Sequence, residues 1–365
     1  MVPYVLASGG KIDRTFSIRL ADEAEIKALE PQADGKIIVG GRFVTLGGLV
    51  RRDIMRLNTD GSIDSSFDVG SGIGTFGSVY TLKVLPNGQM YAGGSFNSLN
   101  GVFGRLLRLN SNGSVDPGFA LSGLDVTFAF DIDTQPDGKV YVSASNLIGS
   151  YFIARFTSAG VNDTGFGQPF FVAGGWSGYT LVFLPAENKL LAGAAVFGQS
   201  FQGVVMKLAT TGGIDNNFLV GLTLAPGASQ RAWAEPMSDG RFLVWGRFDT
   251  VAGVARRNIA ILDADGTVDP SFVPQTESTG TVLSARVQAD GKIILGGSEF
   301  APNGSLHGNL GRLNANGTVD TSFDPGRGAN GDVESLAIVG NKLLVGGKFF
   351  RYDRNPVAGL VRVRL

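Results

Sequence analysis

Asp34-Gly35-Lys36-Ile37-Ile38-Val39-Gly40-Gly41 is the stretch of sequence that decides the fold, because it returns along the whole chain. Successive copies are separated by about 50 residues, a period typical of repeat architectures and not of an ordinary globular domain. The first copy is followed by six others, some of them degraded: Asn87–Gly94, Asp137–Ala144, Asn188–Ala194, Asp239–Gly246, Asp290–Gly297 and Gly340–Gly347.

A second phrase, Asp-Gly-Ser-Ile-Asp-Ser-Ser-Phe at residues 60–67, recurs with the same period. Its aspartate and phenylalanine mark each copy. The aspartates are Asp13, Asp64, Asp116, Asp163, Asp215, Asp269 and Asp320, and the phenylalanines are Phe16, Phe67, Phe119, Phe166, Phe218, Phe272 and Phe323. Units that repeat in this way stack on one another or close into a ring.

Each repeat predicts four strands. In the second repeat they are Val79–Leu85, Gln89–Gly94, Arg105–Asn110 and Ser114–Phe119. Asn-Gly and Asp-Gly pairs between them supply the positive φ angles that short hairpin turns need. Four antiparallel strands are typical of one propeller blade. The sequence therefore predicts an all-β, seven-bladed β-propeller, with blades at about 24–67, 77–119, 127–166, 178–218, 231–272, 281–323 and 332–365.

The two ends of the chain divide one repeat between them. The chain opens with a fourth-strand phrase at 9–16 and stops after a third-strand phrase at 359–365. A ring gains closure from this offset, because the N-terminal strand completes the last blade and leaves no open strand edge there. We expect a single domain over 1–365, with 1–8 as an N-terminal tail and 9–16 as the closing strand of blade seven.

The two phrases resemble the delta-sixty repeat family of bacterial β-propellers over about residues 9–365. The resemblance is close at 34–67, 87–119 and 290–323, and weaker at 137–166 and 188–218. It implies a propeller fold and surface or secreted contexts in bacteria and their viruses. It implies no common reaction, since a fold is not a function.

Composition narrows the function classes. The chain has 31 basic and 32 acidic residues and no cysteine, so nothing in it predicts nucleic-acid binding, disulfides or thiol chemistry. No apolar run is long enough to span a membrane. Residues 1–8 lack a basic start and do not read as a secretion signal. We expect an extracellular, cell-surface or virion location, with no signal peptide in this chain.

Features that recur in every repeat are interpreted as structural, and features that depart from it as candidates for function. Asp263, Asp265 and Asp269 resemble a calcium loop, with carboxylates at alternate positions around a glycine. The alternative is a turn in which aspartate and asparagine side chains accept hydrogen bonds from nearby backbone N–H groups. We favour the turn, because most copies carry too few carboxylates for a metal, and we expect neither a metal nor a cofactor.

Little in the sequence supports catalysis. The only histidine is His307, in a loop, and a lone histidine without cysteine excludes most histidine-built metal sites. A pair of carboxylates can still hydrolyse glycosides. The candidates near inner strands or their entry loops are Asp125, Asp131, Asp133, Glu235, Glu277 and Glu334. An enzyme remains one alternative, but we expect none.

The loops that enter the inner strands, and those that join strands two and three, vary most and are expected to share one face. They carry aromatic residues in blades three to five, beside serine, asparagine and glutamine. Such side chains suit a protein partner or stacking against sugars, although several could simply cap the core. The residues are Phe170, Phe171, Trp176, Tyr179, Trp233, Phe197 and Phe201, and we expect Trp176, Tyr179 and Trp233 to be the main anchors.

The same loops also carry arginines. They suit carboxylates of an acidic glycan or a partner protein, and the alternative is that they brace the loops through backbone carbonyls. The residues are Arg51, Arg52, Arg105, Arg256, Arg257, Arg351 and Arg354.

These observations favour a non-enzymatic binding or assembly module, which presents its variable loop face to another protein in a bacterial surface structure or a phage particle. A glycan-binding propeller is the first alternative, and a carbohydrate-active hydrolase or lyase is the second.

Overall fold

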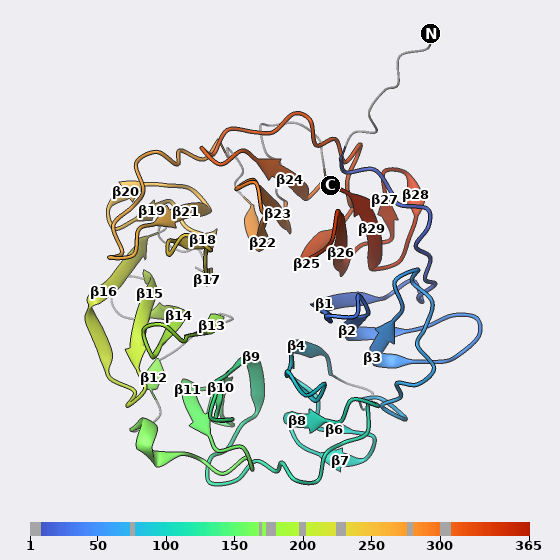
Figure 1. The fold of residues 1–365 in the computed structure, drawn as a ribbon, viewed down its shortest axis with the longest axis horizontal. Coiled ribbons are helices and arrows are strands. Elements are labelled where there is room, and N and C mark those ends of the chain that lie inside the picture. The colour runs from blue at the N-terminus through green and yellow to red at the C-terminus, as the bar shows by residue number, and fades with distance from the viewer. Residues whose placement is uncertain are drawn as a thin grey trace. The chain divides into compact units, whose positions relative to one another are not determined.

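A computed structural model of the chain describes residues 9–73, 77–167, 170–172, 180–196, 202–223, 231–275, 280–299 and 308–365. The chain divides into two compact units, and Figure 1 labels their strands. Unit 1 contains Met1–Phe67 and Val273–Leu365, and unit 2 contains Asp68–Phe272. The described residues are all-β apart from one short 3-10 turn, η1 (Thr164–Phe166). Among them, no helix could cross a lipid bilayer.

Unit 1 is built from three antiparallel sheets of three strands each. In each sheet, consecutive strands of the repeat are hydrogen-bonded neighbours. The sheets are β1 (Glu25–Pro31), β2 (Ile37–Val44) and β3 (Arg52–Leu57); β22 (Thr281–Val287), β23 (Ile293–Ser298) and β24 (Leu310–Leu313); and β25 (Asp332–Val339), β26 (Lys342–Lys348) and β29 (Leu360–Arg364). A small hairpin, β27 (Arg351–Tyr352) and β28 (Asn355–Pro356), precedes β29.

Unit 2 is built from four main sheets. Two of them have three strands: β4 (Val79–Val84), β5 (Met90–Gly94) and β8 (Leu106–Leu109); and β17 (Arg231–Pro236), β18 (Phe242–Arg247) and β21 (Ile259–Leu262). A four-stranded sheet contains β9 (Phe128–Thr134), β10 (Val140–Ser145), β11 (Tyr151–Phe156) and β12 (Phe170–Val172). A six-stranded sheet contains β13 (Thr180–Leu184), β14 (Lys189–Val196), β15 (Gln202–Ala209), β16 (Ile214–Thr223), β19 (Thr250–Val251) and β20 (Val254–Ala255). A hairpin, β6 (Ser98–Leu99) and β7 (Val102–Phe103), lies between β5 and β8.

The hydrophobic core of each unit lies between neighbouring sheets. In unit 1, Ile26 of β1 packs in one buried cluster with Leu344 of β26. In unit 2, Tyr91 of β5 packs in one buried cluster with Ala129 of β9. The first strand of each sheet therefore lies against the next sheet of the same unit, as in unit 2, where β9 contacts both β4 and β13 (Figure 1).

The repeated Gly-Gly pair is required by this close packing. A Cβ at Gly93, the first glycine of its pair, would lie 2.9 Å from Cβ of Ala129 in the next sheet. A Cβ at Gly41, the second glycine of its pair, would collide with the carbonyl oxygen of Glu25 on the adjacent strand. These close approaches explain why glycine recurs at the two positions.

The recurring Asp and Phe belong to a repeated structural unit. In the first repeat, Arg56 Nε lies 2.7 Å from Asp64 Oδ2, and the Arg56 guanidinium lies over the ring of the fully buried Phe67, 5.1 Å from its centroid. The other oxygen of Asp64 accepts the backbone N–H of Ser66 at 3.0 Å. The same contacts return in Arg108, Asp116 and Phe119; Arg155, Asp163 and Phe166; Arg312, Asp320 and Phe323; and Arg362, Asp13 and Phe16.

The expectation of four strands in every repeat is wrong. Five of the sheets have three strands, and the Asp–Phe phrase joins its sheet by a single bridge, such as Leu57 with Ile63. The reason is local, because Asp64 accepts the amide of Ser66 and turns the chain one residue after the bridge. Phe67 then enters the core, so the segment cannot continue as a strand.

Residues 9–13 pair with the last strand of the chain, as the divided repeat predicts. Ile12 bridges Val363, and the amides of Gly10 and Asp13 donate to the carbonyls of Arg364 at 2.7 Å and Arg362 at 2.8 Å. The N-terminal segment thus occupies, beside β29, the place that residues 60–64 occupy beside β3. Like the copies beside β3, β8, β21 and β24, it joins its sheet by a single bridge and not as a full strand, whereas the copy with Asp215 lies within β16.

Candidate binding site

One residue in the first strand of five sheets lies in a β-bulge. It faces no partner on the second strand, because the register shifts on either side of it. Bulges are common beside functional sites, where they redirect a side chain. The five bulge residues are Lys27, Leu283 and Glu334 in unit 1, and Tyr80 and Phe130 in unit 2.

The type of side chain at the bulge position varies from sheet to sheet, whereas the type at the preceding position does not. The residue before it is small or aliphatic, such as Ile26, Val79 or Ala129, and is buried in every case. The bulge residue itself is a lysine, a glutamate, a tyrosine, a phenylalanine or a leucine. Because the backbone irregularity recurs and the side chain does not, the bulge positions are the best candidates for function in the described part of the chain.

In unit 2 the bulge residues form an aromatic cluster, defined as Tyr80, Phe128, Phe130 and Tyr151. The rings of Tyr80 and Phe130 are nearly parallel, with centroids 6.3 Å apart and planes 5° apart. Phe130 also stacks with Phe128 at 6.2 Å and with Tyr151 at 5.6 Å. Phe128 is 36% exposed and the other three are half-buried, and Phe130 and Tyr151 pack against the buried cluster around Tyr141, so the aromatic cluster borders the core and reaches the surface.

Register places the aromatic cluster beside a strongly exposed loop. Ser145, the last residue of β10, lies opposite both Phe128 and Tyr151. The loop that follows Ser145 has Leu147 and Ile148 at its tip, which are 78% and 85% exposed. The cluster and the loop tip therefore lie at the same end of this sheet. Phe103, on the hairpin after β5, is equally exposed at the corresponding end of its own sheet.

In unit 1 the bulge residues of two adjacent sheets form a charged cluster, defined as Glu25, Lys27 and Glu334. Lys27 Nζ lies 2.8 Å from Glu25 Oε1 and 2.8 Å from Glu334 Oε2. Burial raises the pKa of Glu334 above its usual value, against the attraction of Lys27. Partial burial also works against ionisation of Glu25, but its contacts with Lys27 outweigh this and lower its pKa. The two carboxylates thus differ in acidity although both contact the same lysine.

Three of the six carboxylates that the sequence offers as acid–base candidates accept hydrogen bonds from backbone amides. Asp131 and Asp133 on β9 accept the backbone amides of Leu181 at 2.8 Å and Phe183 at 2.7 Å, both on β13. Burial raises the pKa of Asp131 to about 6 despite these hydrogen bonds. Asp125 accepts the amide of Leu147 at 3.2 Å and holds the exposed loop. These three residues support neighbouring strands and loops.

Two other carboxylates of that set have different positions. Glu235 lies on β17, and Glu334 belongs to the charged cluster. Glu277 and the lone histidine, His307, fall outside the described residues.

Of the predicted aromatic anchors, the structure describes one in detail. Trp233 is half-buried on β17, opposite the buried Trp245 on β18. Phe170 and Phe171 lie on β12, which pairs with β11. The remaining aromatic candidates, Trp176, Tyr179, Phe197 and Phe201, fall outside the described residues, and their role stays a prediction.

Three of the predicted arginines contact backbone carbonyls. Arg51 is buried and donates to the carbonyl of Phe67 at 3.1 Å, and Arg105 donates to the carbonyl of Ser95 at 3.0 Å. Arg256 donates to the carbonyl of Ala255 at 2.9 Å. These contacts are those of the loop-bracing alternative.

The other four arginines are exposed. Arg257 pairs with Asp249 at 3.2 Å on the surface. Arg52 begins β3, and Arg351 and Arg354 lie on and just after β27 in unit 1. A ligand-binding role for these exposed arginines stays a prediction.

The calcium-like phrase forms a hydrogen-bonded turn. Asp265 accepts the amide of Thr267 at 2.9 Å and its hydroxyl at 2.7 Å. Asp269 pairs with Arg241 at 2.5 Å. Their oxygens are therefore used within the chain, as in the turn interpretation. Across the residues that the structure describes, no group of three or more histidine, cysteine, aspartate or glutamate side chains is placed to hold a metal ion.

Comparison with known proteins supports the fold. Residues 32–67, 85–119, 238–272 and 288–323 match a family model described as a domain of unknown function (DUF5122) beta-propeller. These four segments are thus similar to repeats of that β-propeller family, and the specific resemblance to the delta-sixty family stays a prediction. No curated protein matches the sequence.

Two solved structures share the architecture. The WD40 β-propeller domain of Doa1 aligns with a TM-score of 0.57 and 13% identity, over 98% of this chain and 96% of that one. The extracellular domain of a putative hybrid two component system from B. thetaiotaomicron aligns with a TM-score of 0.51 and 12% identity, over 97% of this chain and 39% of that one. At such identities the likeness shows a β-propeller fold and nothing further.

Proposed function

We propose that this β-propeller repeat protein is a non-enzymatic binding or assembly module, which contacts a partner protein through unit 2. The observation that carries the proposal is the aromatic cluster, whose stacked rings stay partly exposed beside the apolar tip of the β10–β11 loop. Partly exposed aromatic side chains next to apolar loop tips are typical of residues that dominate protein interfaces.

The energetics favour a protein partner over solvent. Leu147 and Ile148 leave most of their surface in water, and burying such side chains yields about 25 cal/mol for each Å² of apolar surface removed from water. Contiguous exposed apolar surface of this kind marks interaction sites on soluble proteins. The amide of Leu147 donates to Asp125 at 3.2 Å, which holds the loop while its apolar tip stays exposed.

We further propose the finer architecture and setting. The seven repeats form one closed seven-bladed ring, with the N-terminal segment completing the last blade. The protein is proposed to act in a bacterial surface structure or a phage particle. One protein of similar fold is an extracellular domain, which is in keeping with a surface setting.

Glycan binding is the alternative that one observation favours. Half-exposed aromatic rings can stack on sugar faces, and Phe128 together with Tyr80 offers such rings. The exposed aliphatic tip at Leu147 and Ile148 argues for a protein, because sugars offer little apolar surface for it to contact.

Catalysis is not part of the proposal. The charged cluster brings two carboxylates to one lysine, and this is the nearest approach to an acid–base pair among the described residues. Lys27 contacts both carboxylates, so neither is presented alone to a substrate. We therefore infer that the charged cluster ties β1 to β25, together with the hydrogen bond from Ser335 Oγ to the carbonyl of Ile26 at 3.0 Å.

The experiment compares capture of partners from extracts of the source organism by the wild type, Phe128→Ala and Ile148→Ser. Val161→Ser is the matched control, because Val161 is 49% exposed in the Asp–Phe phrase that follows β11. We expect one protein to be retained by the wild type and the control and lost by both test variants, with a silent glycan array. Sugar binding that is lost in Phe128→Ala would instead favour the glycan alternative.

A further inference from the structure

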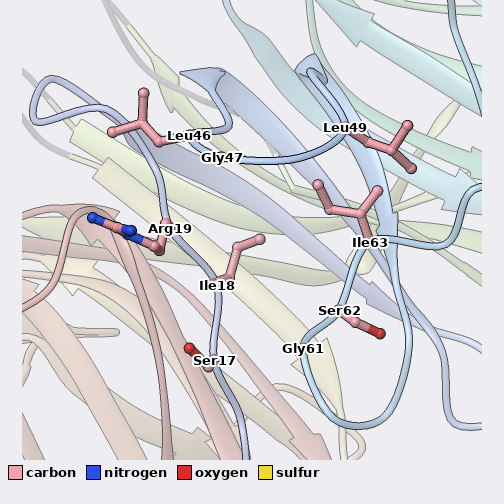
Figure 2. A pocket seen from close by; sticks show the side chains of 9 residues that line it. All are labelled: Ser17, Ile18, Arg19, Leu46, Gly47, Leu49, Gly61, Ser62 and Ile63. Atoms are coloured by element: carbon pink, nitrogen blue, oxygen red, sulfur yellow. The ribbon is translucent and has the colours of Figure 1, made fainter.

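A hollow of about 360 Å³ lies in unit 1, at the outer edge of the sheet β1–β2–β3. Figure 2 shows that three segments surround it: the N-terminal segment at 17–19, the β2–β3 loop at 46–49, and the Asp–Phe phrase at 61–63. Ile18 and Ile63 extend into the space between these segments, and Leu46 and Leu49 lie on the loop beside it. Each of the three segments thus contributes an aliphatic side chain to the lining, which also contains Ser17, Arg19 and Ser62.

The corresponding space in the sheet β9–β12 is closed by main-chain hydrogen bonds. The segment that enters this sheet pairs with the Asp–Phe phrase as a parallel strand. Ala120 N donates to the carbonyl of Ala159, Ser122 N to that of Gly160, and Asn162 N to that of Ser122, each at 3.0 Å. No main-chain group of the two segments needs an outside partner at these positions.

The sheet β22–β24 closes the same space in a similar way. Val273 N donates to the carbonyl of Asn316 at 3.1 Å, and Gln275 N donates to that of Gly317 at 3.0 Å. The entering segment again follows the Asp–Phe phrase for two successive hydrogen bonds.

In two further sheets, an aspartate side chain accepts an amide of the entering segment. Asp68, at the start of its entering segment, accepts the amide of Gly70 at 2.8 Å, and Asp324 accepts the amide of Gly326 at 2.8 Å. Beside Gly70, the Asn100 side chain accepts the amide of Ser71 at 3.2 Å. Side chains thus cap the amides that the other two sheets pair with backbone.

Beside β1–β3 neither device is present. Ser17 N donates to the carbonyl of Asp60 at 3.1 Å, as in the other sheets, but the second hydrogen bond is not made. Within the described residues, the amides of Arg19 and Ile63 and the carbonyl of Gly61 have no hydrogen-bond partner. Ser17 stands where two other sheets have aspartate and leaves the amide of Arg19 uncapped.

The side chains beside this space are also less polar than those at the same place in the second sheet. Leu46, which donates its amide to the carbonyl of Arg19 at 2.8 Å, stands where the second sheet has the polar Asn100. Leu46 is 47% exposed and Leu49 is 45% exposed. An apolar wall therefore borders the main-chain groups that lack partners, which is the composition of a site for an extended peptide and not for a small polar molecule.

We propose that this edge binds an extended peptide segment of a partner protein. Its main chain would pair with the amides of Arg19 and Ile63, and its aliphatic side chains would enter the hollow between Ile18, Ile63 and Leu46. The exposed Arg19 side chain has no ion pair among the described residues, so an acidic residue in the peptide complements it. Main-chain pairing supplies affinity, and the aliphatic pocket supplies selectivity. This site is separate from the aromatic cluster and does not depend on it.

The test is selection of random peptides displayed on phage against the full chain, followed by binding of the selected synthetic peptides. The test variant is Ser17→Asp with Leu46→Asn, which installs the residues found at these places in the second sheet. The control is Val254→Asn, because Val254 is 42% exposed on β20 in unit 2. We expect the double variant to keep the wild-type melting temperature, since the installed residues already serve in another sheet. We expect the same of Val254→Asn, since Val254 lies on the surface.

We expect the selected peptides to combine alternating aliphatic residues with an acidic one. Their Kd should rise at least tenfold in the double variant and stay unchanged in Val254→Asn, and bound peptide should slow amide exchange at Arg19 and Ile63. The proposal is overturned if no peptide is enriched on the wild type beyond the double variant. Equal binding to both, or protection confined to other segments, overturns it as well.

Discussion

Replacing Asp13 tests how the N-terminal segment is held to the last strand. Asp13 is 3% exposed and accepts Arg362 Nε at 2.9 Å and Nη2 at 2.8 Å. It also accepts the amide of Thr15 at 3.1 Å and its hydroxyl at 2.8 Å. Asp13→Ala leaves a buried guanidinium without its carboxylate, and breaking a buried pair in this way costs about 3–5 kcal/mol.

The matched control is Asp60→Ala, in an exposed turn of the same repeated phrase. Asp60 accepts the amide of Ser62 at 2.9 Å and its hydroxyl at 2.7 Å, and the charge of Arg362 only helps to lower its pKa, without an ion pair between the two. Loss of these exposed contacts should destabilise the protein much less than loss of the buried pair. Urea-induced unfolding of both variants at pH 7 gives the comparison. If Asp13→Ala costs no more than Asp60→Ala, the buried pair with Arg362 does not hold the segment in place.

The same pair makes a pH prediction. Burial works against ionisation of Asp13, but the Thr15 hydrogen bonds and the Arg362 charge together hold its pKa below the usual range. A carboxyl with a lowered folded pKa contributes stability above its unfolded pKa of about 3.9, and this stability is lost as pH falls through the folded value. The stability gap between wild type and Asp13→Ala should therefore narrow below about pH 4. A gap that is constant down to pH 2 would contradict this reasoning.

Four further outcomes follow from the scaffold. Phe67→Ala and Phe272→Ala should each cost about 3–5 kcal/mol in urea unfolding, since both rings are fully buried; a cost under 1 kcal/mol would contradict their place in the core. Deleting residues 1–16 should cost several kcal/mol, because Phe16 and the pairing with β29 are lost. Burial raises the pKa of Asp131 to about 6, so wild-type stability should fall as pH rises from about 4 to about 6, and Asp131→Asn should not show that fall. A chelator should leave the melting temperature unchanged, whereas a rise of several degrees with calcium would point to 263–269.

The repeat itself made much of the scaffold predictable from sequence. Asp64 and Phe67 recur in every repeat and are buried, and the aspartate is paired with a cation. The Gly-Gly pairs also recur, and they lie at points of close approach, as Gly93 does beside Ala129. A single sequence gave this information because each structural requirement is stated several times along the chain.

The fourth strand was misjudged because alternation of residues does not show where a side chain turns the backbone. The phrase at 60–67 alternates like a strand, yet the hydrogen bond from the amide of Ser66 to Asp64 ends it after one bridge. A recurring aspartate two residues before a serine or glycine amide is the local signal for such a turn.

The bulge residues were missed for a different reason. The sequence prediction favours aromatic residues in variable loops, so it names Trp233 and residues outside the described part of the chain. Tyr80 and Phe130 lie within predicted strands and are therefore not among its candidates. Alignment of the repeats carries the signal: one position within the first strand changes from Lys27 to Tyr80 to Glu334, while the residue before it stays small or aliphatic. Periodicity alone hides this position, because a bulge adds a residue to the strand without changing its composition.

Site-specific photo-crosslinking in the source organism tests most directly whether the aromatic cluster contacts a partner protein. The photoreactive residue p-benzoylphenylalanine is placed at Phe128, in the aromatic cluster, or at Asp137, in the exposed hairpin turn at the other end of the same sheet. If the aromatic cluster binds the partner, we expect a crosslink to one partner protein from position 128 and none from position 137. A partner crosslinked from position 137 and not from position 128 would contradict it.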